Sequence, residues 1–323
     1  MARAIRFRQT GGPEVLALEQ VDVGDPGPGQ ARVRHTYVAV NFIDIYFRTG
    51  RYPLALPNGL GSDAVGVVEA VGEGVVDVSV GDRVGYLIGP QGAYSDVRLL
   101  PADVLIPLPE GVSDRVASAL MMKGLTAQYL FRQVYPLHGG ETILFHAAAG
   151  GVGLIACQWA FALGVKMIGI VSSDEKAEVA RAHGCTHTIV TGREDIAKRV
   201  RELTDGKGVP VVYDSVGKDT LAASLDSLQP RGTLVSNGTT SGPVVIDSMQ
   251  LAAKGSLWFT RPAMMHYIQP RSHMLAMADE LFGHVLSGRI AAEPKQEFAL
   301  ADAAEAHRAL ESRKTVGATV LVP

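Results

Sequence analysis

The sequence predicts an α/β protein built from a β-rich domain and a doubly wound parallel-sheet domain. Three observations support this fold class. Residues 1–115 contain short apolar runs broken by Gly and Pro. From about residue 120, apolar strands alternate with longer amphipathic helices. Within residues 142–153, a strand runs directly into a glycine-rich turn that opens a helix.

Composition narrows the class of protein before any motif is considered. The 323 residues are 47% hydrophobic and 20% charged, which suits two globular domains and not a disordered chain. A formal net charge of -3, with no run of Lys and Arg, argues against nucleic-acid binding. Only two cysteines are present, and no stretch reaches about 18 apolar residues. We therefore expect a cytoplasmic protein with no membrane span.

The first region is expected to form a compact, barrel-like β domain. The segments Ala31–Val40 and Ala64–Val71 are predicted to be strands. Turn signals at 25–29 and 107–111 separate the strands and favour a barrel over a parallel sheet.

The second region is predicted to contain repeated right-handed strand-helix-strand units. Its candidate strands are Thr142–Ala147, Lys166–Val171, Thr186–Val190, Val209–Asp214 and Gly232–Ser236. Beyond it, a long helix over Met274–Leu286 and a final strand over Ala318–Val322 indicate that the chain returns to complete the first domain. The predicted division is therefore 1–122 together with 256–323 for the first domain and 123–255 for the second.

The glycine-rich turn has the pattern of a dinucleotide-binding fingerprint, with Ala148 at its first position. Gly150 is expected to let the backbone approach a pyrophosphate, and Gly153 to let the helix pack closely on the strand. The free N–H groups at the start of the helix would stabilise phosphate charge. The helix carries one apolar stripe at spacings of three and four residues and is expected to end at Gly164. The alternative is an ordinary tight turn.

The end of the second strand favours NADPH over NADH. An NAD enzyme usually carries an acidic residue there to bind the ribose 2′-hydroxyl, but this chain continues with Ser172. Ser172 and Lys176 could donate to a 2′-phosphate. Asp174 is expected to be the N-cap of the next helix. Arg193 is either a further phosphate contact or a solvated surface residue.

Several motifs together resemble the medium-chain dehydrogenase/reductase superfamily, and within it the NADPH:quinone oxidoreductase branch related to zeta-crystallin. The resemblance covers nearly the whole chain. The resemblance rests on the motifs Val38–Tyr46, Gly59–Gly66, Val80–Val84, Ala147–Gly153, Val212–Gly217 and Thr260–Pro262. It implies a GroES-like first domain completed by the C-terminus, an inserted Rossmann domain that binds NADPH, and a homodimer.

The resemblance also implies a set of cofactor-binding residues. In the first domain these are Asn41, Asp44, Tyr46, Phe259, Arg261 and Arg313, and in the second Thr126, Ala149, Gly150, Gly151, Val152, Ser172, Lys176, Thr191, Ser215, Asn237 and Thr239. Relatives often carry aromatic residues near Thr191 and Asn237, and this chain departs from that pattern.

No metal site is expected. Zinc-dependent members of the superfamily place a Cys in the Asn41 region and a Gly-His-Glu segment where this chain has Gly61-Ser-Asp63. The two cysteines, Cys157 and Cys185, are too few for a structural zinc site. Without Lewis-acid activation, the acceptor would already have to be electrophilic.

The expected chemistry is therefore direct hydride transfer from NADPH to a quinone or a similar conjugated carbonyl. Tyr46 is the first candidate for hydrogen bonding to the developing oxyanion, followed by Tyr52 and Arg261. For Tyr46, the alternative is packing without proton transfer. Two other functions remain open: an NADPH-dependent enone or enoyl-thioester reductase, and a non-catalytic NADPH-binding protein with a crystallin-like or RNA-binding role.

Overall fold

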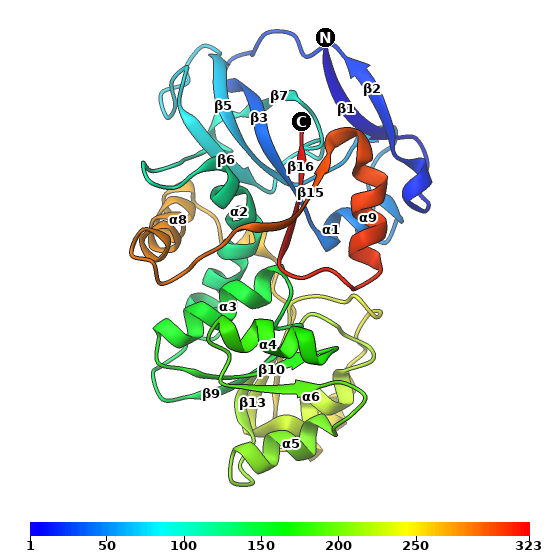
Figure 1. The fold of residues 1–323 in the computed structure, drawn as a ribbon, viewed down its shortest axis with the longest axis vertical. Coiled ribbons are helices and arrows are strands. Elements are labelled where there is room, and N and C mark those ends of the chain that lie inside the picture. The colour runs from blue at the N-terminus through cyan, green and yellow to red at the C-terminus, as the bar shows by residue number, and fades with distance from the viewer. The chain divides into compact units, whose positions relative to one another are not determined.

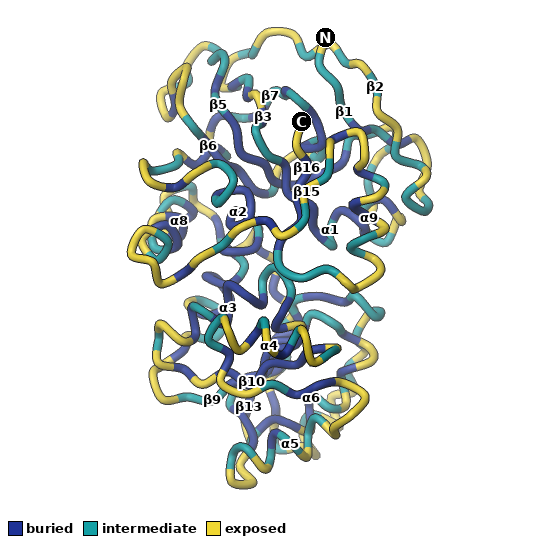
Figure 2. Tube along the Cα trace, viewed as in Figure 1, coloured by how far each residue is buried: buried dark blue, intermediate teal, exposed yellow.

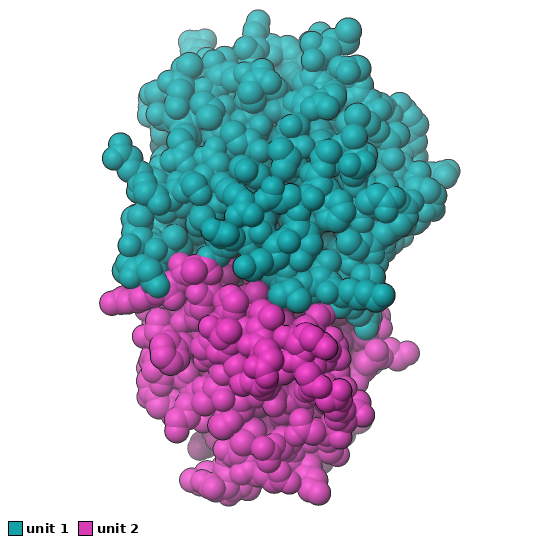
Figure 3. Space-filling view, in the orientation of Figure 1, with its two compact units in different colours: residues 1–125, 270–288, 292–323 teal, residues 126–269, 289–291 magenta.

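The computed structural model describes residues 1–323, which divide into two compact units. The first comprises 1–125, 270–288 and 292–323, and the second comprises 126–269 and 289–291 (Figure 3). Figure 2 shows that buried residues concentrate on the central strands, whereas exposed ones lie on the connections and on the outer sides of the helices. None of the helices is both long and apolar enough to cross a bilayer.

The first unit is rich in β structure, as predicted (Figure 1). Its strands are β1 (Ala2–Phe7), β2 (Ala17–Val21), β3 (Gln30–Val40), β4 (Asn58–Gly59), β5 (Asp63–Val71), β6 (Arg83–Leu87), β7 (Val97–Pro101), β8 (Ile106–Pro107), β15 (Pro294–Ala299) and β16 (Ala318–Val322). Its helices are α1 (Phe42–Arg48), α8 (Arg271–Leu286), α9 (Ala303–Glu311) and the first part of α2 (Asp114–Tyr129), with short 3-10 turns at Pro13–Val15, Ala102–Val104 and Leu300–Asp302.

Two sheets build this unit. The smaller has the order β2-β1-β4, and the larger has the order β15-β16-β3-β5-β6-β8, with β7 also paired to β3. Strand β16 pairs antiparallel with β3, so that Thr319 lies opposite Val40. The C-terminal segment therefore completes the sheet that the N-terminal segment begins, as the sequence predicts. Val33 in the first half of β3 and Val38 in its second half lie in the apolar core between the sheets and α9, with an irregularity of register between them.

The second unit is a doubly wound sheet. It contains β9 (Thr142–His146), α3 (Gly151–Ala162), β10 (Lys166–Val171), α4 (Asp174–Ala182), β11 (His187–Val190), α5 (Ile196–Leu203), β12 (Val209–Asp214), α6 (Leu221–Ser227), β13 (Leu228–Ser236), α7 (Ser248–Ala253) and β14 (Trp258–Thr260). A π-helical turn at Leu130–Val134 and a 3-10 turn at Met264–His266 flank these elements.

All neighbouring strands of this sheet are parallel, in the order β11-β10-β9-β12-β13-β14. Helices α3 and α4 contact each other, and so do α5 and α6, as expected when helices cover both faces of the sheet. The strand order reverses between β9 and β12, and ligands bind at such a switch point in open α/β sheets. Strand β14 is the sixth strand of this sheet, whereas the division by sequence assigned everything after residue 255 to the first domain.

Candidate functional site

The glycine-rich turn links β9 to α3 in a tight conformation. Ala147 adopts a φ of 56°, and the Gly150 amide donates to the Ala147 carbonyl oxygen at 2.9 Å. A Cβ at Gly153 would lie 2.4 Å from that same oxygen, closer than real contacts allow. Gly153 is therefore required by the close packing of helix on turn, as predicted. The first amides of α3 have no intrahelical acceptor and are available to an anion.

The helix that follows confirms the predicted apolar face. Ile155, Ala156, Trp159 and Ala160 are all buried against the sheet. Gly164 has a φ of 70° directly after the C-cap residue, the left-handed conformation that glycine adopts most easily.

The region after β10 is arranged slightly differently from the prediction. The N-cap of α4 is Ser173, whose Oγ accepts from the Lys176 amide at 3.3 Å, so the assignment of the cap to Asp174 was wrong by one residue. Asp174 instead pairs with Arg193 at 2.5 Å. Ser172 is exposed and Lys176 is half-buried, and burial lowers the pKa of the Lys176 ammonium. Because Asp174 is paired with Arg193, its carboxylate already has a cationic partner.

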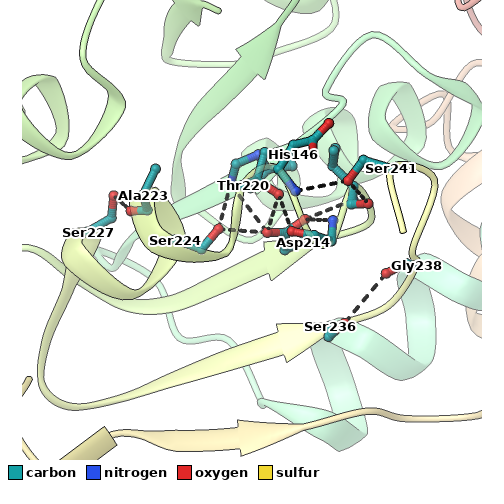
Figure 4. Close-up of polar contacts among 12 residues, drawn as sticks. His146, Asp214, Thr220, Ala223, Ser224, Ser227, Ser236, Gly238 and Ser241 are labelled. Carbon is teal, nitrogen blue, oxygen red and sulfur yellow. Dashed lines mark hydrogen bonds and ion pairs between the residues drawn. The ribbon is translucent and has the colours of Figure 1, made fainter. Parts of the chain in front are cut away.

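A buried polar cluster lies at the carboxyl ends of β9 and β12 (Figure 4). The Asp214 Oδ1 atom accepts from the amides of Val216 and Gly217 at 2.8 and 3.0 Å. Its Oδ2 atom accepts from the hydroxyls of Thr220 and Ser224, each at 2.7 Å. Ser224 Oγ also lies 3.0 Å from His146 Nε2. This cluster fixes the loop that begins at Ser215.

The same cluster holds a second loop beside the first. The Asn237 amide donates to the Asp214 carbonyl oxygen at 2.9 Å, and Gly217 bridges to Gly242. Burial lowers the pKa of His146, so this imidazole is neutral. Since Ser224 donates its proton to Asp214, His146 must donate from Nε2. Ser224, His146 and Asp214 resemble a catalytic triad in composition, but all three are buried. They therefore anchor the loop and offer no nucleophile to a substrate.

Several predicted residues lie on these loops or close to them. Asn237 Oδ1 is buried without a hydrogen-bond partner, whereas Thr191 Oγ1 donates to the Val171 carbonyl oxygen at 3.2 Å. The other predicted residues of this unit are half-buried Thr126, Ser215 and Phe259, buried Thr239 and exposed Arg261.

In the first unit, the side chain of Asn41 lies between two buried charges. Asn41 Nδ2 donates to Asp63 Oδ1 at 2.6 Å, and Lys123 Nζ donates to Asn41 Oδ1 at 2.8 Å. These partners fix which way the amide points, because a carboxylate only accepts and an ammonium only donates. Burial raises the pKa of Asp63 and lowers that of Lys123, and each charge opposes the shift of the other.

Asn41 is also the N-cap of α1, where it forms a capping box with Asp44. Asp44 is fully buried, and its carboxylate accepts from the Asn41 amide at 2.8 Å, Ser62 Oγ at 3.1 Å and Tyr94 Oη at 3.0 Å. Burial, together with the charge of Asp63, raises the pKa of Asp44 to about 7, although the hydrogen bonds from Asn41, Tyr94 and Ser62 oppose this shift. The Asp44 side chain thus has partners within its own unit.

Tyr46 follows on the same helix and is 7% exposed. Its ring packs edge-to-face against Tyr52 with centroids 5.2 Å apart, and the Arg51 guanidinium carbon lies 4.8 Å from its centroid. The structure therefore brings the two candidate tyrosines together. Arg313, by contrast, is an exposed residue with a φ of 57° in the loop after α9.

Comparisons with known proteins agree with this arrangement. The family model described as alcohol dehydrogenase GroES-like domain matches residues 27–110, and the one described as zinc-binding dehydrogenase matches residues 151–278. A quinone oxidoreductase of Pseudomonas aeruginosa is 55% identical over the full length of both chains. The chain belongs to the quinone oxidoreductase family of the medium-chain dehydrogenase/reductase superfamily.

A solved structure and a further relative support the same family membership. The structure of Escherichia coli quinone oxidoreductase complexed with NADPH superimposes with a TM-score of 0.98, at 46% identity and full coverage of both chains. A 2-haloacrylate reductase from Burkholderia sp. is also 46% identical, covering 100% of this chain and 99% of its own. Both the fold class and the family resemblance are therefore confirmed.

Sequence reasoning missed most of the buried polar groups of this family member. Tyr94, Lys123 and His307 are 50 to 259 positions away from the side chains they contact, and no local pattern marks them. Asp214 lies within a motif that was quoted for the resemblance, but its role as an anchor was not foreseen. His146 is also buried, and no local pattern marks it as a member of this cluster.

Proposed function

We propose that this protein is an NADPH-dependent quinone oxidoreductase that transfers a hydride to a quinone or a similar conjugated carbonyl. The observation that carries the proposal is the tight turn before α3, in which Gly153 permits a contact that no side chain would allow. Full-length relatives named quinone oxidoreductase, and a neighbour solved with NADPH, support the same activity.

The residues of the second unit fit a dinucleotide. The backbone of Ala149, Gly150, Gly151 and Val152 would bind the diphosphate at the start of α3. Ser172 and Lys176 would donate to the 2′-phosphate. The buried Asn237 Oδ1 atom lacks a hydrogen-bond partner, and an amide donor of the cofactor would satisfy it. Thr126, Thr191, Ser215, Thr239, Phe259 and Arg261 are proposed as further cofactor contacts.

The first unit would supply the side chains of the reaction site. Asn41, Asp44 and Tyr46 are proposed to contact the nicotinamide nucleotide, together with Arg313 at its other end. Bound NADPH supplies the hydride. Tyr46 would donate a hydrogen bond to the acceptor oxygen as negative charge develops there, with Tyr52 and Arg261 as secondary donors. The acceptor would take up one proton in addition to the hydride, and a quinone would thereby become a hydroquinone.

We propose that the reaction does not use zinc, although one matching family model is described as zinc-binding. The support is positive: Lys123 places an ammonium beside Asn41 and Asp63, in the region where zinc-dependent relatives hold metal. A divalent cation at that position would meet the repulsion of this charge. Across the chain, no group of three His, Cys, Asp or Glu side chains is arranged to hold a metal ion.

The second candidate is reduction of an activated C=C bond. It is favoured by the 2-haloacrylate reductase, which matches the chain over its full length at 46% identity. Such a reaction would use the same cofactor site with a differently shaped acceptor pocket. A third function, NADPH binding without turnover, has no specific observation in its favour.

We further propose a cytoplasmic homodimer. The two cysteines are unpaired, as in a reducing compartment. Strand β14 is an edge of the second unit's sheet, and Trp258 on it is 67% exposed. An exposed edge strand with a large apolar side chain suits pairing with a second copy. Light scattering on the wild type and on Trp258→Lys tests this: the wild type should have the mass of a dimer and the variant that of a monomer.

The activity is tested by NADPH oxidation in the presence of a panel of quinones, enones and haloacrylates, with and without a chelator. We expect the quinones to be reduced fastest and the chelator to have no effect. Loss of activity with chelator would contradict the zinc-free mechanism. NADPH binding without oxidation of any acceptor would contradict the enzymatic function.

A further inference from the structure

A row of four buried ionisable side chains joins the C-terminal helix α9 to α1. Arg48 Nη1 lies 3.0 Å from His307 Nδ1, His307 Nε2 lies 3.0 Å from Tyr94 Oη, and Tyr94 Oη lies 3.0 Å from Asp44 Oδ2. None of the four is more than 1% exposed. The row reaches the surface at Glu311, which is bound to Arg48 at 2.5 Å and is about one-third exposed.

The direction of every hydrogen bond in this row is fixed by its first member. A guanidinium only donates, so His307 Nδ1 must accept and the proton of the neutral imidazole must be on Nε2. Nε2 then donates to the Tyr94 oxygen, and the Tyr94 hydroxyl is left to donate to Asp44. Burial and the nearby Arg48 lower the pKa of His307 to about 3, which keeps the ring neutral.

Asp44 is therefore the acceptor on which all donors converge. Tyr94, Ser62 and the Asn41 amide each donate to it, and these three hydrogen bonds stabilise the carboxylate more than the neutral carboxyl. Arg48 cannot release its proton, and the row therefore cannot deliver protons to a substrate. Its effect is to favour the ionised form of Asp44 against the cost of burial. The charged or titratable groups that interact with Asp44 are Asp63 from β5, Lys123 from α2 and Tyr94. His307 from α9 and Arg48 follow beyond Tyr94 in the row.

Ionised Asp44 matters because α1 is only seven residues long. Such a short helix is marginal without tertiary support. A carboxylate in its first turn interacts favourably with the helix dipole and closes the capping box with Asn41. A protonated carboxyl would lose its favourable interaction with the dipole and accept a weaker hydrogen bond from Asn41, which would loosen the segment that carries Asn41 and Tyr46.

We propose that Tyr94 and His307 are positioning residues that keep Asp44 ionised and thereby hold the start of α1, with Asn41 and Tyr46, in its reactive arrangement. The inference rests on the proposed function, because it assigns Asn41 and Tyr46 to the reaction site.

The first test reads the carboxylate itself, in protein without cofactor. Aspartate carboxyl carbons are labelled with ¹³C and titrated by NMR, and Asp44→Asn assigns the Asp44 signal. Tyr94→Phe removes one donor, and we expect it to move the Asp44 midpoint about one pH unit higher, a tenfold change in proton affinity. His307→Gln keeps an acceptor for Arg48 and a donor for Tyr94, and should titrate like the wild type. His307→Leu keeps neither and should shift the midpoint upward.

A matched control separates this effect from the general loss of a buried hydroxyl. Tyr86→Phe removes a fully buried hydroxyl that is bound to His35 at 3.0 Å, elsewhere in the same unit. It should leave the Asp44 midpoint unchanged. Should His307→Leu fail to fold, Tyr94→Phe and His307→Gln decide the question.

The second test asks whether the ionisation of Asp44 controls the order of α1 and the rate of the reaction. Amide hydrogen exchange in residues 41–48 should become faster in Tyr94→Phe and stay unchanged in Tyr86→Phe. The acid limb of kcat with a quinone should move up by the same pH interval as the NMR midpoint, with KM for NADPH nearly constant. An unchanged Asp44 midpoint in Tyr94→Phe, or a shifted midpoint with wild-type exchange and an unshifted kcat profile, would overturn the inference. A wild type that does not oxidise NADPH would instead refute the proposed function, and the NMR and exchange results would still report on the row.

Discussion

The two units prepare for ligands by different physical means. In the second unit, the turn before α3 presents backbone amides, and glycine is needed only because a Cβ at Gly153 would strike the Ala147 carbonyl. In the first unit, the predicted site segment is held by buried side chains, where Asn41 lies between Asp63 and Lys123 and Asp44 accepts three hydrogen bonds. One region depends on chain geometry, and the other depends on charge.

Because of this difference, the two regions should respond differently to pH and to substitution. A backbone site is insensitive to pH, because amides do not titrate, but it is intolerant of added atoms. A site built on buried charges tolerates small changes of shape, but it responds to any change that leaves one charge without its partner. Substitutions and pH should therefore separate the two regions.

The largest effect is expected from Gly153→Ala. The new Cβ would lie 2.4 and 2.5 Å from the carbonyl oxygens of Ala147 and Ala148, so α3 must move away from the turn. We expect NADPH affinity to fall by about 100-fold or more, since diphosphate binding depends on this approach. Isothermal titration calorimetry measures the change.

A matched glycine lies in the first unit for comparison. Gly283 is inside α8, and a Cβ there meets nothing within 4 Å. Gly283→Ala should bind NADPH normally and be more stable by about 0.5–1 kcal/mol. Equal NADPH affinity in both variants would contradict the assigned role of the turn.

The second-largest effect is expected from Lys176, which is proposed to bind the 2′-phosphate and not the diphosphate. Lys176→Ala should weaken NADPH by about 10- to 100-fold, because a charge-assisted hydrogen bond to the 2′-phosphate is lost. NADH binding should be almost unaffected. Fluorescence titration with both cofactors measures the ratio, and Lys198→Ala, an exposed lysine on α5, is the control. Parallel losses for the two cofactors would place the 2′-phosphate elsewhere.

A smaller effect is expected in the first unit. Tyr46→Phe should lower kcat with quinones by about tenfold, since one hydrogen bond to the developing oxyanion is removed. The dissociation constant of NADPH should stay within about twofold, because the phosphates are bound by the other unit. Tyr52→Phe, which alters the neighbouring ring, should have a weaker effect on turnover. Wild-type rates for Tyr46→Phe with several acceptors would remove this residue from the mechanism.

The smallest effect concerns stability and pH. Burial lowers the pKa of His35 to about 4, below its ordinary value of 6.5, while Ser95 and Tyr86 satisfy the neutral ring. As pH falls from 6.5 towards 4, the unfolded chain binds a proton that the folded chain refuses, so stability decreases in this window. We expect the melting temperature to fall by a few degrees on going from pH 7 to 5. In His35→Gln, calorimetry should record a smaller fall, and an identical pH dependence would show that His35 does not contribute.

The two regions also differ in how far their sequences reveal them. Strands Lys166–Val171, Val209–Asp214 and Ala318–Val322 have the bounds that the apolar runs predict, because short buried runs bordered by turn residues are local signals. The turn and helix at 147–164 are equally local. The contacts of Arg48 with His307, and of Lys123 with Asn41, join positions 259 and 82 residues apart. The first contact depends on the docking of α9 and the second on the packing of α2 beside the start of α1, which residue spacing cannot show.

The central claim is that NADPH bound through the turn before α3 reduces a quinone without metal. The most direct measurement is stopped-flow oxidation of NADPH by a quinone, with wild type and Gly153→Ala compared in the presence of a chelator. We predict rapid, chelator-insensitive oxidation by the wild type and a rate for Gly153→Ala that recovers only at much higher NADPH concentration. Equal NADPH dependence in the two proteins, or a wild-type rate abolished by the chelator, would contradict this account.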